Sequence, residues 1–170
     1  VKAATAKGIW VANVPDYCGE DVSDQALALL MSCVRKVALR DRQVRAGIWD
    51  MQSAGPEWRM QGKTMVLFGF GQIARILHRK LGGFQLKRVL VYDPFLDEAA
   101  IRALGAEKTD WDTALREGDF FSIHMPLNDK TRGLFNEEAL RKMKPTAILV
   151  NTSRGPIIDE TALVEALQKK

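Results

Sequence analysis

The stretch Thr64-Met-Val-Leu-Phe-Gly-Phe-Gly-Gln-Ile-Ala-Arg-Ile-Leu77 decides the fold of this chain. Residues Met65 to Phe68 form a short apolar run free of turn formers, which predicts a buried strand. Gly69, Gly71 and Ala74 follow at once, and a helix is predicted from there through Leu81. The sequence therefore indicates a strand that opens through a glycine loop into a helix.

The glycine loop suits the binding of an anion. The start of a helix exposes backbone N–H groups and the positive end of the helix dipole. Gly69 permits a sharp turn, Gly71 removes a side chain that would block a pyrophosphate, and Ala74 lets the helix pack on the strand. Taken alone this pattern is a weak signal, because glycines between a strand and a helix are often only a tight turn.

A second strand, Arg88-Val-Leu-Val-Tyr-Asp93, strengthens the interpretation. Asp93 ends this strand and lies 19 residues after Ala74. A dinucleotide fingerprint places an acidic residue about 20 residues further on, where it accepts hydrogen bonds from the adenosine ribose. Strand, glycines, helix, strand and acid in this order predict a dinucleotide site.

Size and composition indicate one soluble globular domain. The chain has 170 residues, of which 46% are hydrophobic and 27% charged, and no apolar run approaches the length of a membrane span. The first residues lack the apolar core of a signal peptide. Two cysteines, Cys18 and Cys33, are too few for a disulfide framework and show no metal spacing, so we expect a cytoplasmic protein without a metal site. Cys33 falls in a helical apolar pattern and is expected in the core.

The net charge of +4 is mild and gives no reason to expect a nucleic-acid partner. Several cations gather in the second half of one predicted helix, where they suit the helix dipole, without interleaved aromatic residues. We interpret them as a solvated helix end. They are Arg35, Lys36, Arg40, Arg42 and Arg45.

The segments before the glycine loop are less regular. Gly8 to Asn13 alternates like a strand, and Asp21 to about Val44 is predicted as one long helix whose first half is apolar nearly all round. Such a helix needs cover from a second domain or subunit. Residues 47–62 form a loop or arm that contains Trp49 and Trp58. Exposed tryptophans there would mark an interface, but we expect them to fold onto the domain's own core.

Beyond residue 63 strands and helices alternate, which predicts an α/β fold with a doubly wound parallel sheet in the order 3-2-1-4-5. The further strands are predicted near residues 106–108, 120–124 and 147–151, and the further helices at 97–104, 111–116, 136–142 and 160–167.

Ligands of such a sheet bind outside the carboxyl ends of the strands. Arg154 follows the last strand, where its guanidinium could hold a carboxylate or, equally, tie helix carbonyls. His124 follows the strand at 120–124, and its neighbours Met125 and Pro126 favour a packing or cofactor-edge role over that of a proton carrier.

Five motifs resemble, in order, those of NAD-dependent D-2-hydroxyacid dehydrogenases, a family that includes phosphoglycerate dehydrogenase. The motifs are Asn13-Val-Pro-Asp-Tyr-Cys-Gly-Glu-Asp-Val-Ser-Asp24, Gly69-Phe-Gly-Gln-Ile-Ala74, Tyr92-Asp-Pro94, His124-Met-Pro-Leu127 with Thr131, and Val150-Asn-Thr-Ser-Arg-Gly-Pro156. The resemblance implies a Rossmann fold, NAD as cofactor, a small 2-hydroxy or 2-oxo acid as substrate and a homodimer.

The resemblance also implies individual roles. Gln72 and Ile73 offer N–H groups to the pyrophosphate, Asp93 binds the adenosine ribose, and Arg154 binds the substrate carboxylate and polarises its carbonyl as the catalytic residue. The implied cofactor-binding residues are Gly69, Phe70, Gly71, Gln72, Ile73, Asp93, Pro94, His124, Met125, Pro126, Thr131, Thr152, Ser153 and Arg154.

The chain departs from the family pattern at several places. Gly19 and Asn128 stand where threonine is common, and Gln85 stands where glycine is usual. In the family a glutamate and a histidine further downstream of the arginine motif complete the catalytic set, and this sequence stops at Lys170, before either position. We therefore expect residues 1–16 to be a remnant of a substrate domain and residues 17–170 to be an NAD-binding domain incomplete at its C-terminal side, inactive by itself.

Two other functions fit part of the pattern. An NAD-responsive, non-enzymatic interaction module like the C-terminal-binding-protein corepressors would keep the same scaffold. A methyltransferase or other nucleotide-binding α/β domain would bind S-adenosylmethionine better than NAD. Asp93 without an adjacent arginine predicts NAD over NADP, because the acid repels a 2′-phosphate.

Overall fold

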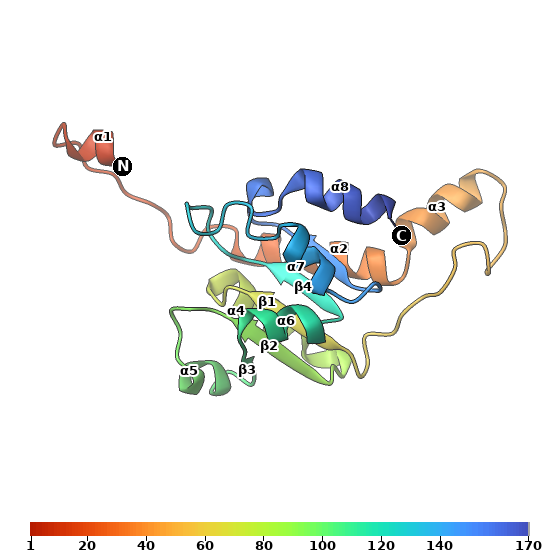
Figure 1. Ribbon diagram of the computed structural model, residues 1–170. Coiled ribbons are helices and arrows are strands. Elements are labelled where there is room, and N and C mark those ends of the chain that lie inside the picture. The colour runs from red at the N-terminus through yellow and green to blue at the C-terminus, as the bar shows by residue number, and fades with distance from the viewer. Residues whose placement is uncertain (170) are drawn as a thin grey trace.

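The computed structural model describes residues 1–169 and contains one five-stranded parallel sheet (Figure 1). The strand order is β3-β2-β1-β4-β5, so the direction of winding reverses between β1 and β4. The predicted fold class and strand order are confirmed. The strands are β1 (Thr64–Phe68), β2 (Arg88–Tyr92), β3 (Glu107–Lys108), β4 (Phe120–Ile123) and β5 (Ile148–Asn151).

Helices lie between the strands and cover both faces of the sheet (Figure 1). The α-helices are α1 (Lys2–Thr5), α2 (Gly19–Val34), α3 (Val37–Arg45), α4 (Gln72–Lys80), α5 (Glu98–Arg102), α6 (Trp111–Glu117), α7 (Glu137–Lys142) and α8 (Glu160–Gln168). Two short 3-10 helices, η1 (Leu81–Phe84) and η2 (Gly155–Ile157), complete the set.

The strand predicted at Gly8 to Asn13 is wrong. These residues form an exposed, irregular tail that leads away from the body of the molecule (Figure 1). The alternating pattern finds no neighbouring strand within residues 1–169, and an extended segment without a hydrogen-bonded neighbour is not a stable strand. Trp10 of this tail is 99% exposed.

The single long helix predicted from Asp21 to Val44 is also wrong, because the structure divides it into α2 and α3. Lys36, between them, adopts a left-handed backbone with φ of +54°, and its ammonium group donates to the carbonyl of Ala54 in the following arm. Cys33 lies in the last turn of α2, outside the buried face that contains Leu30 and Val34, so it is exposed and the prediction that it belongs to the core is wrong.

Residues 46–62, which we call the arm, project from the body beside α3 (Figure 1). Arg40 donates to the carbonyls of Asp50 and Met51 at 2.8 and 2.6 Å and pairs with Glu57, as Arg35 does. Arg35, Lys36 and Arg40 therefore hold the arm in place, and for these three the interpretation as a solvated helix end is wrong. Arg45 instead pairs with Asp41 within α3.

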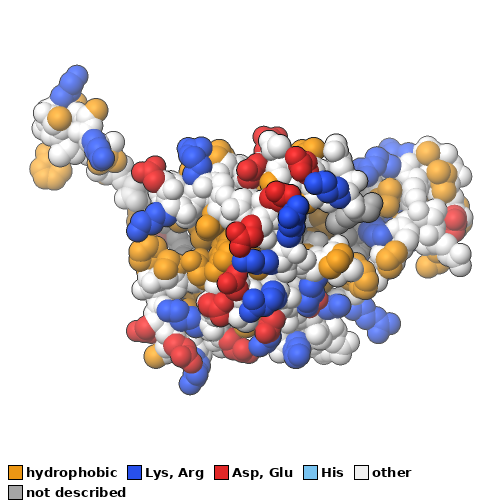
Figure 2. Space-filling model, in the orientation of Figure 1, with side chains coloured by type: hydrophobic (Ala, Val, Ile, Leu, Met, Phe, Trp, Pro, Cys, Tyr) orange, Lys and Arg blue, Asp and Glu red, His pale blue; other side chains and the backbone are white. Residues whose placement is uncertain are grey.

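The arm and the N-terminal tail both carry apolar side chains at the surface (Figure 2). Trp58 packs against the core, as predicted, but Trp49 is 88% exposed and contradicts the prediction. Within residues 1–169, no helix combines the length and the apolar character needed to cross a membrane.

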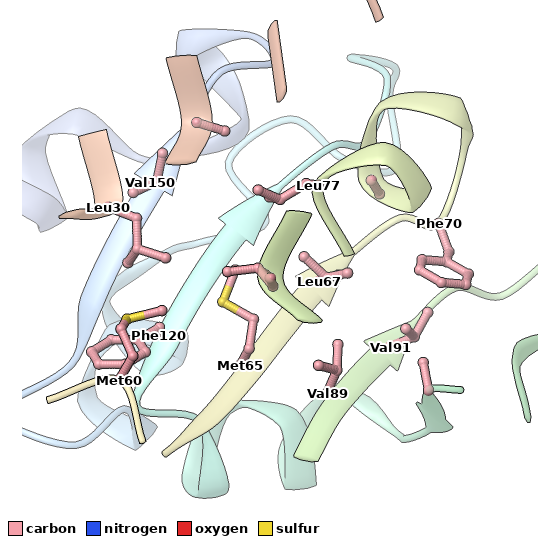
Figure 3. Packing of buried hydrophobic residues seen from close by; sticks show 14 of the residues in the cluster. Leu30, Met60, Met65, Leu67, Phe70, Leu77, Val89, Val91, Phe120 and Val150 are labelled. Carbon is pink, nitrogen blue, oxygen red and sulfur yellow. The ribbon is translucent and has the colours of Figure 1, made fainter. Parts of the chain in front are cut away.

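Alternate residues of the central strand β1 enter two separate cores. Met65 and Leu67 pack with α2 and α4 on one face (Figure 3), and Val66 and Phe68 pack with α6 and α7 on the other. All five residues of β1 are buried for this reason, which explains its uninterrupted apolar sequence.

Helices α5 to α8 each have an N-cap residue whose side chain accepts a hydrogen bond from a backbone N–H of the first turn. Such caps satisfy donors that a helix cannot satisfy internally. The capping residues are Asp97, Asp110, Asn136 and Asp159. These helices therefore have part of their N-terminal hydrogen-bonding capacity occupied by the protein.

Gln85 has a φ of +53°, in the left-handed region that favours glycine. Its carbonyl accepts from the Gly62 N–H at 3.0 Å, and its side chain accepts from that of Gln61 at 2.9 Å. These two bonds tie the end of the arm to the turn before β2 and offset the cost of the backbone conformation.

Asp119 fastens the opposite edge of the sheet, where β1 and β4 begin. Its carboxylate accepts from the Thr64 N–H and from the Lys144 ammonium, each at 2.9 Å, and lies 4.0 Å from the Lys63 ammonium. Burial raises the pKa of Asp119, but the Lys144 and Thr64 hydrogen bonds and the two positive charges outweigh burial, so that the pKa lies below its ordinary 3.8.

We expect Asp119→Asn to lower the free energy of unfolding by about 2 kcal/mol at pH 7, because it removes an ionised acceptor from a partly buried site. The lowered pKa means that this stabilisation is complete above the unfolded-state value and is lost as pH falls through the folded-state value. Urea unfolding at pH 7 and in acid measures both effects. The exposed Asp129→Asn serves as control, and equal losses for the two variants would contradict the prediction.

Candidate functional site

The loop after β1 passes very close to the end of β4. Gly69 has a φ of +86°, and a Cβ atom there would lie 3.0 Å from the carbonyl oxygen of His124. Both facts restrict this position to glycine. A Cβ on Gly71 would meet no atom within 4 Å, so the space in front of the next helix is open.

Helix α4 begins at Gly71 without a side-chain cap. Helices α1, α2 and α3 also lack a side-chain cap, whereas α5 to α8 have one. What sets α4 apart is that its uncapped start follows directly from the central strand β1 through the glycine loop. A nine-residue helix of this kind presents a positive dipole end and several donors to an anion. Ala74 is fully buried against the sheet, as the fingerprint predicts.

Asp93, at the end of β2, faces this loop. Its carboxylate accepts from the Phe70 N–H and from the Phe95 N–H, each at 2.9 Å. Pro94 is exposed, and Phe95 is 91% exposed. Asp93 therefore joins the turns after β1 and β2 and keeps a negative charge beside the start of α4.

The end of β4 holds His124 and Met125 at the point where the strand order reverses. The backbone N–H of His124 donates to the Phe68 carbonyl at 2.8 Å. The ring Nε2 of His124 lies 2.8 Å from the hydroxyl of Ser122. Burial lowers the pKa of His124 to about 4, so its ring is neutral at pH 7. A partly buried, neutral histidine agrees with the predicted packing or cofactor-edge role and not with a proton carrier near pH 7.

Thr131 stabilises the loop that follows. Its hydroxyl donates to the carbonyl of Pro126 at 2.6 Å and accepts from the Asn128 N–H at 2.9 Å, while the Asn128 side chain accepts from the N–H groups of Lys130 and Thr131. The Thr131 hydroxyl is thus occupied by its own loop. Pro126 is exposed at the edge of the site.

The turn after β5 contains Thr152, Ser153 and Arg154. The Ser153 hydroxyl donates to the carbonyl of Ile123 at 2.7 Å, which ties this turn to the end of β4. The Thr152 hydroxyl is buried and has no hydrogen-bond partner among residues 1–169. The exposed Arg154 donates one Nη to the Ser153 carbonyl at 2.8 Å, which leaves other donors of its fork available.

The structure thus places the predicted residues in four turns at the carboxyl ends of β1, β2, β4 and β5. Three residues that hold these turns in place by hydrogen bonds were not predicted from the sequence. Arg75 donates its Nε to the Phe70 carbonyl at 2.9 Å, Asn151 bonds both Ser153 and Arg154, and Ser122 bonds His124. Asparagine at a strand end is a recognisable turn signal. For Ser122 the only signal is a hydroxyl two residues before a histidine in a strand.

These features fit an extended nucleotide that carries phosphates. The open space at Gly71 and the uncapped start of α4 suit a pyrophosphate, and the unpartnered Thr152 hydroxyl suits a polar group of a ligand. Among residues 1–169, no group of three or more His, Cys, Asp or Glu side chains could hold a metal ion.

Comparison with known proteins agrees with this geometry. Residues 27–170 match the family described as "D-isomer specific 2-hydroxyacid dehydrogenase, NAD binding domain". The chain is 37% identical to a glyoxylate reductase of Thermococcus litoralis, with 99% of this chain and 53% of the relative covered. It is 38% identical to a D-3-phosphoglycerate dehydrogenase of Mycobacterium leprae, with 99% of this chain and 31% of the relative covered.

A solved structure agrees as well. The D-lactate dehydrogenase of Aquifex aeolicus, determined with NAD and lactic acid, superposes with a TM-score of 0.90 at 28% identity, over 99% of this chain and 50% of that one. The chain therefore spans about half the length of the glyoxylate reductase and of this neighbour, and less of the phosphoglycerate dehydrogenase.

All three named proteins are oxidoreductases, so the comparisons give no support to the corepressor-like module or to a methyltransferase. The match covers the glycine loop, Asp93, His124 and the turn that contains Arg154. This chain belongs to the NAD-binding domain family of the D-isomer-specific 2-hydroxyacid dehydrogenases.

Proposed function

We propose that the chain binds NAD along the carboxyl edge of its sheet and serves hydride transfer between NAD and a small D-2-hydroxy or 2-oxo acid. The observation that carries the proposal is the uncapped start of α4 behind the open Gly71, with the Asp93 carboxylate held beside it by the Phe70 N–H. The positive end of the α4 dipole suits the pyrophosphate of a dinucleotide, and the adjacent Asp93 carboxylate suits the hydroxyl groups of its ribose.

Each turn has a role in this proposal. The N–H groups of Gln72 and Ile73 bind the pyrophosphate, and Asp93 accepts from the adenosine ribose. Gly69 and Phe70 belong to the glycine loop that approaches the phosphates, and Pro94 follows Asp93. His124, Met125 and Pro126 line the adenine side, and Thr131 holds the loop that follows them. Thr152 and Ser153 line the nicotinamide side, where the free Thr152 hydroxyl supports a polar contact. NAD itself supplies the hydride chemistry.

Arg154 is the residue that we assign to the substrate. It is exposed just beyond β5, and one Nη bonds the Ser153 carbonyl while the rest of the guanidinium remains free for a carboxylate. A cation there also stabilises the negative charge that forms on the carbonyl oxygen during hydride transfer.

We further propose that residues 1–16 belong to a substrate domain, that the protein is a homodimer and that it is cytoplasmic. The exposed tail supports the domain division. The exposed apolar arm supports the homodimer, since Val44, Ile48 and Met51 line an apolar hollow there beside the exposed Trp49. Two free cysteines suit a reducing compartment.

Cofactor titration tests the central proposal. We expect NAD to bind at least about tenfold more tightly than NADP, because Asp93 accepts from the ribose and repels a 2′-phosphate. Asp93→Asn keeps the shape of the side chain but removes its charge, so the preference should shrink by roughly tenfold. Fluorescence titration of both cofactors measures the ratio, with Asp129→Asn as the control. Equal affinities of the unaltered chain for NAD and NADP would contradict the assignment of Asp93.

Arg154→Gln should weaken the binding of oxamate, a non-reacting analogue of a 2-oxo acid, by roughly tenfold or more in the presence of NADH, because a charge-assisted fork is lost. Calorimetry measures the affinity. Arg132→Gln removes an equally exposed arginine from the preceding loop and should leave oxamate binding unchanged. If both variants bind oxamate as the unaltered chain does, Arg154 is not the carboxylate ligand.

Light scattering tests the homodimer. The unaltered chain should be dimeric, and Trp49→Glu should shift it toward the monomer, because a charge in an apolar interface must be desolvated. Trp10→Glu changes another exposed tryptophan, outside the arm, and provides the control. A monodisperse monomer of the unaltered chain would refute this part of the proposal.

A further inference from the structure

Ser122 is one of three buried polar residues that the structure shows, with Ser23 and Thr64. It lies in β4 between Leu67 of β1 and Val150 of β5, and it is 1% exposed. A hydroxyl in such apolar surroundings is costly unless it forms a hydrogen bond. A side chain of this kind inside the sheet therefore needs a specific reason.

The reason is the ring of His124. Ser122 and His124 are two residues apart in an extended segment, so their side chains leave the chain on the same face. The Ser122 hydroxyl lies 2.8 Å from Nε2, and within residues 1–169 it has no other hydrogen-bond partner. The hydroxyl hydrogen is satisfied only if it is donated to Nε2.

A ring nitrogen that accepts a hydrogen bond carries no proton, so the neutral imidazole must carry its proton on Nδ1. No hydrogen bond to Nδ1 occurs within residues 1–169, and Nδ1 is not among the buried atoms that lack a partner. Nδ1 is therefore accessible and offers an N–H donor to a ligand.

The backbone of His124 is fixed at the centre of the site. The backbone N–H of His124 donates to the Phe68 carbonyl. The backbone carbonyl of His124 lies so close to Gly69 that a Cβ atom on Gly69 would be 3.0 Å from the carbonyl oxygen. His124 thus stands beside the glycine loop, at the reversal of strand order where the cofactor crosses the sheet edge.

We propose that Ser122 is a positioning residue, which holds His124 in the Nδ1–H tautomer so that the imidazole donates a neutral hydrogen bond to an oxygen of the bound dinucleotide. This inference rests on the proposed NAD site. It explains why a polar residue occupies the interior of β4 and gives His124 a chemical task that needs no change of protonation.

The tautomer is measured first, without any ligand. The chain contains two histidines, so long-range ¹H–¹⁵N spectra show two imidazoles, and His78→Gln identifies the signals of His124. We expect a protonated Nδ1 and an unprotonated Nε2 in the unaltered chain, and a mixture of tautomers in Ser122→Ala. A protonated Nε2 in the unaltered chain would overturn the proposal.

NAD affinity is measured next, with variants that separate the two ring nitrogens. In His124→Asn the amide NH₂ occupies the place of Nδ1, whereas in His124→Gln it occupies the place of Nε2. We expect His124→Asn to bind NAD within about threefold of the unaltered chain, and His124→Gln and Ser122→Ala to bind roughly tenfold more weakly. Ser122→Thr, which retains the hydroxyl, should recover the loss.

The outcomes distinguish this proposal from the one on which it rests. If the unaltered chain binds NAD but His124→Asn and His124→Gln bind it equally well, the donor role of Nδ1 is refuted and the NAD site stands. If the unaltered chain binds no NAD, the proposed function fails and the donor role fails with it. The histidine variants leave Ser122 in place, so they decide the matter even if Ser122→Ala does not fold.

Discussion

The contact between Gly69 and the carbonyl of His124 is the constraint on which the site depends. It brings the ends of β1 and β4 together at the reversal of strand order, and only a residue without a side chain fits both the positive φ and the 3.0 Å approach. From this contact the chain turns into α4 with its first N–H groups free. A larger residue at this position would have to displace the backbone of β4 and, with it, His124.

Hydrogen bonding is distributed unevenly over the molecule, and two unsatisfied features lie together in the candidate site. Helices α5 to α8 are capped by their own side chains, whereas α4 is not. The Thr152 hydroxyl is buried without a partner, although Ser153 beside it is fully bonded. Of the buried side-chain atoms without a partner among residues 1–169, Thr152 Oγ1 lies in the candidate site, whereas those of Gln43, His78 and Arg88 lie outside the four candidate turns. A buried hydroxyl of this kind gains from a polar ligand.

Much of the fold followed from local pattern, because a parallel sheet covered on both faces leaves continuous apolar strands such as β1 and regular helices between them. The conformation of the tail at residues 8–13 did not follow from its pattern, because an alternating apolar sequence forms a strand only beside a hydrogen-bonded neighbouring strand. The end of α2 was also hidden, because Lys36 in a left-handed conformation has no sequence signal comparable to glycine. The turns that we propose for the cofactor were predicted by motif, but Ser122 and Asn151 act through hydrogen bonds that only the folded arrangement reveals.

The two ends of the sheet do different work. At the amino ends of the strands, Asp119 and Lys144 join neighbouring strands. At the carboxyl ends, a few hydrogen bonds hold each turn, and the Thr152 hydroxyl and the first N–H groups of α4 have no side-chain partner. Apart from Gly69, a scaffold divided in this way can accept substitutions in the exposed parts of its ligand-facing turns while the attachments at the amino ends keep the strands together. That separation gives a physical basis for the divergence of substrate preference among proteins that share this architecture.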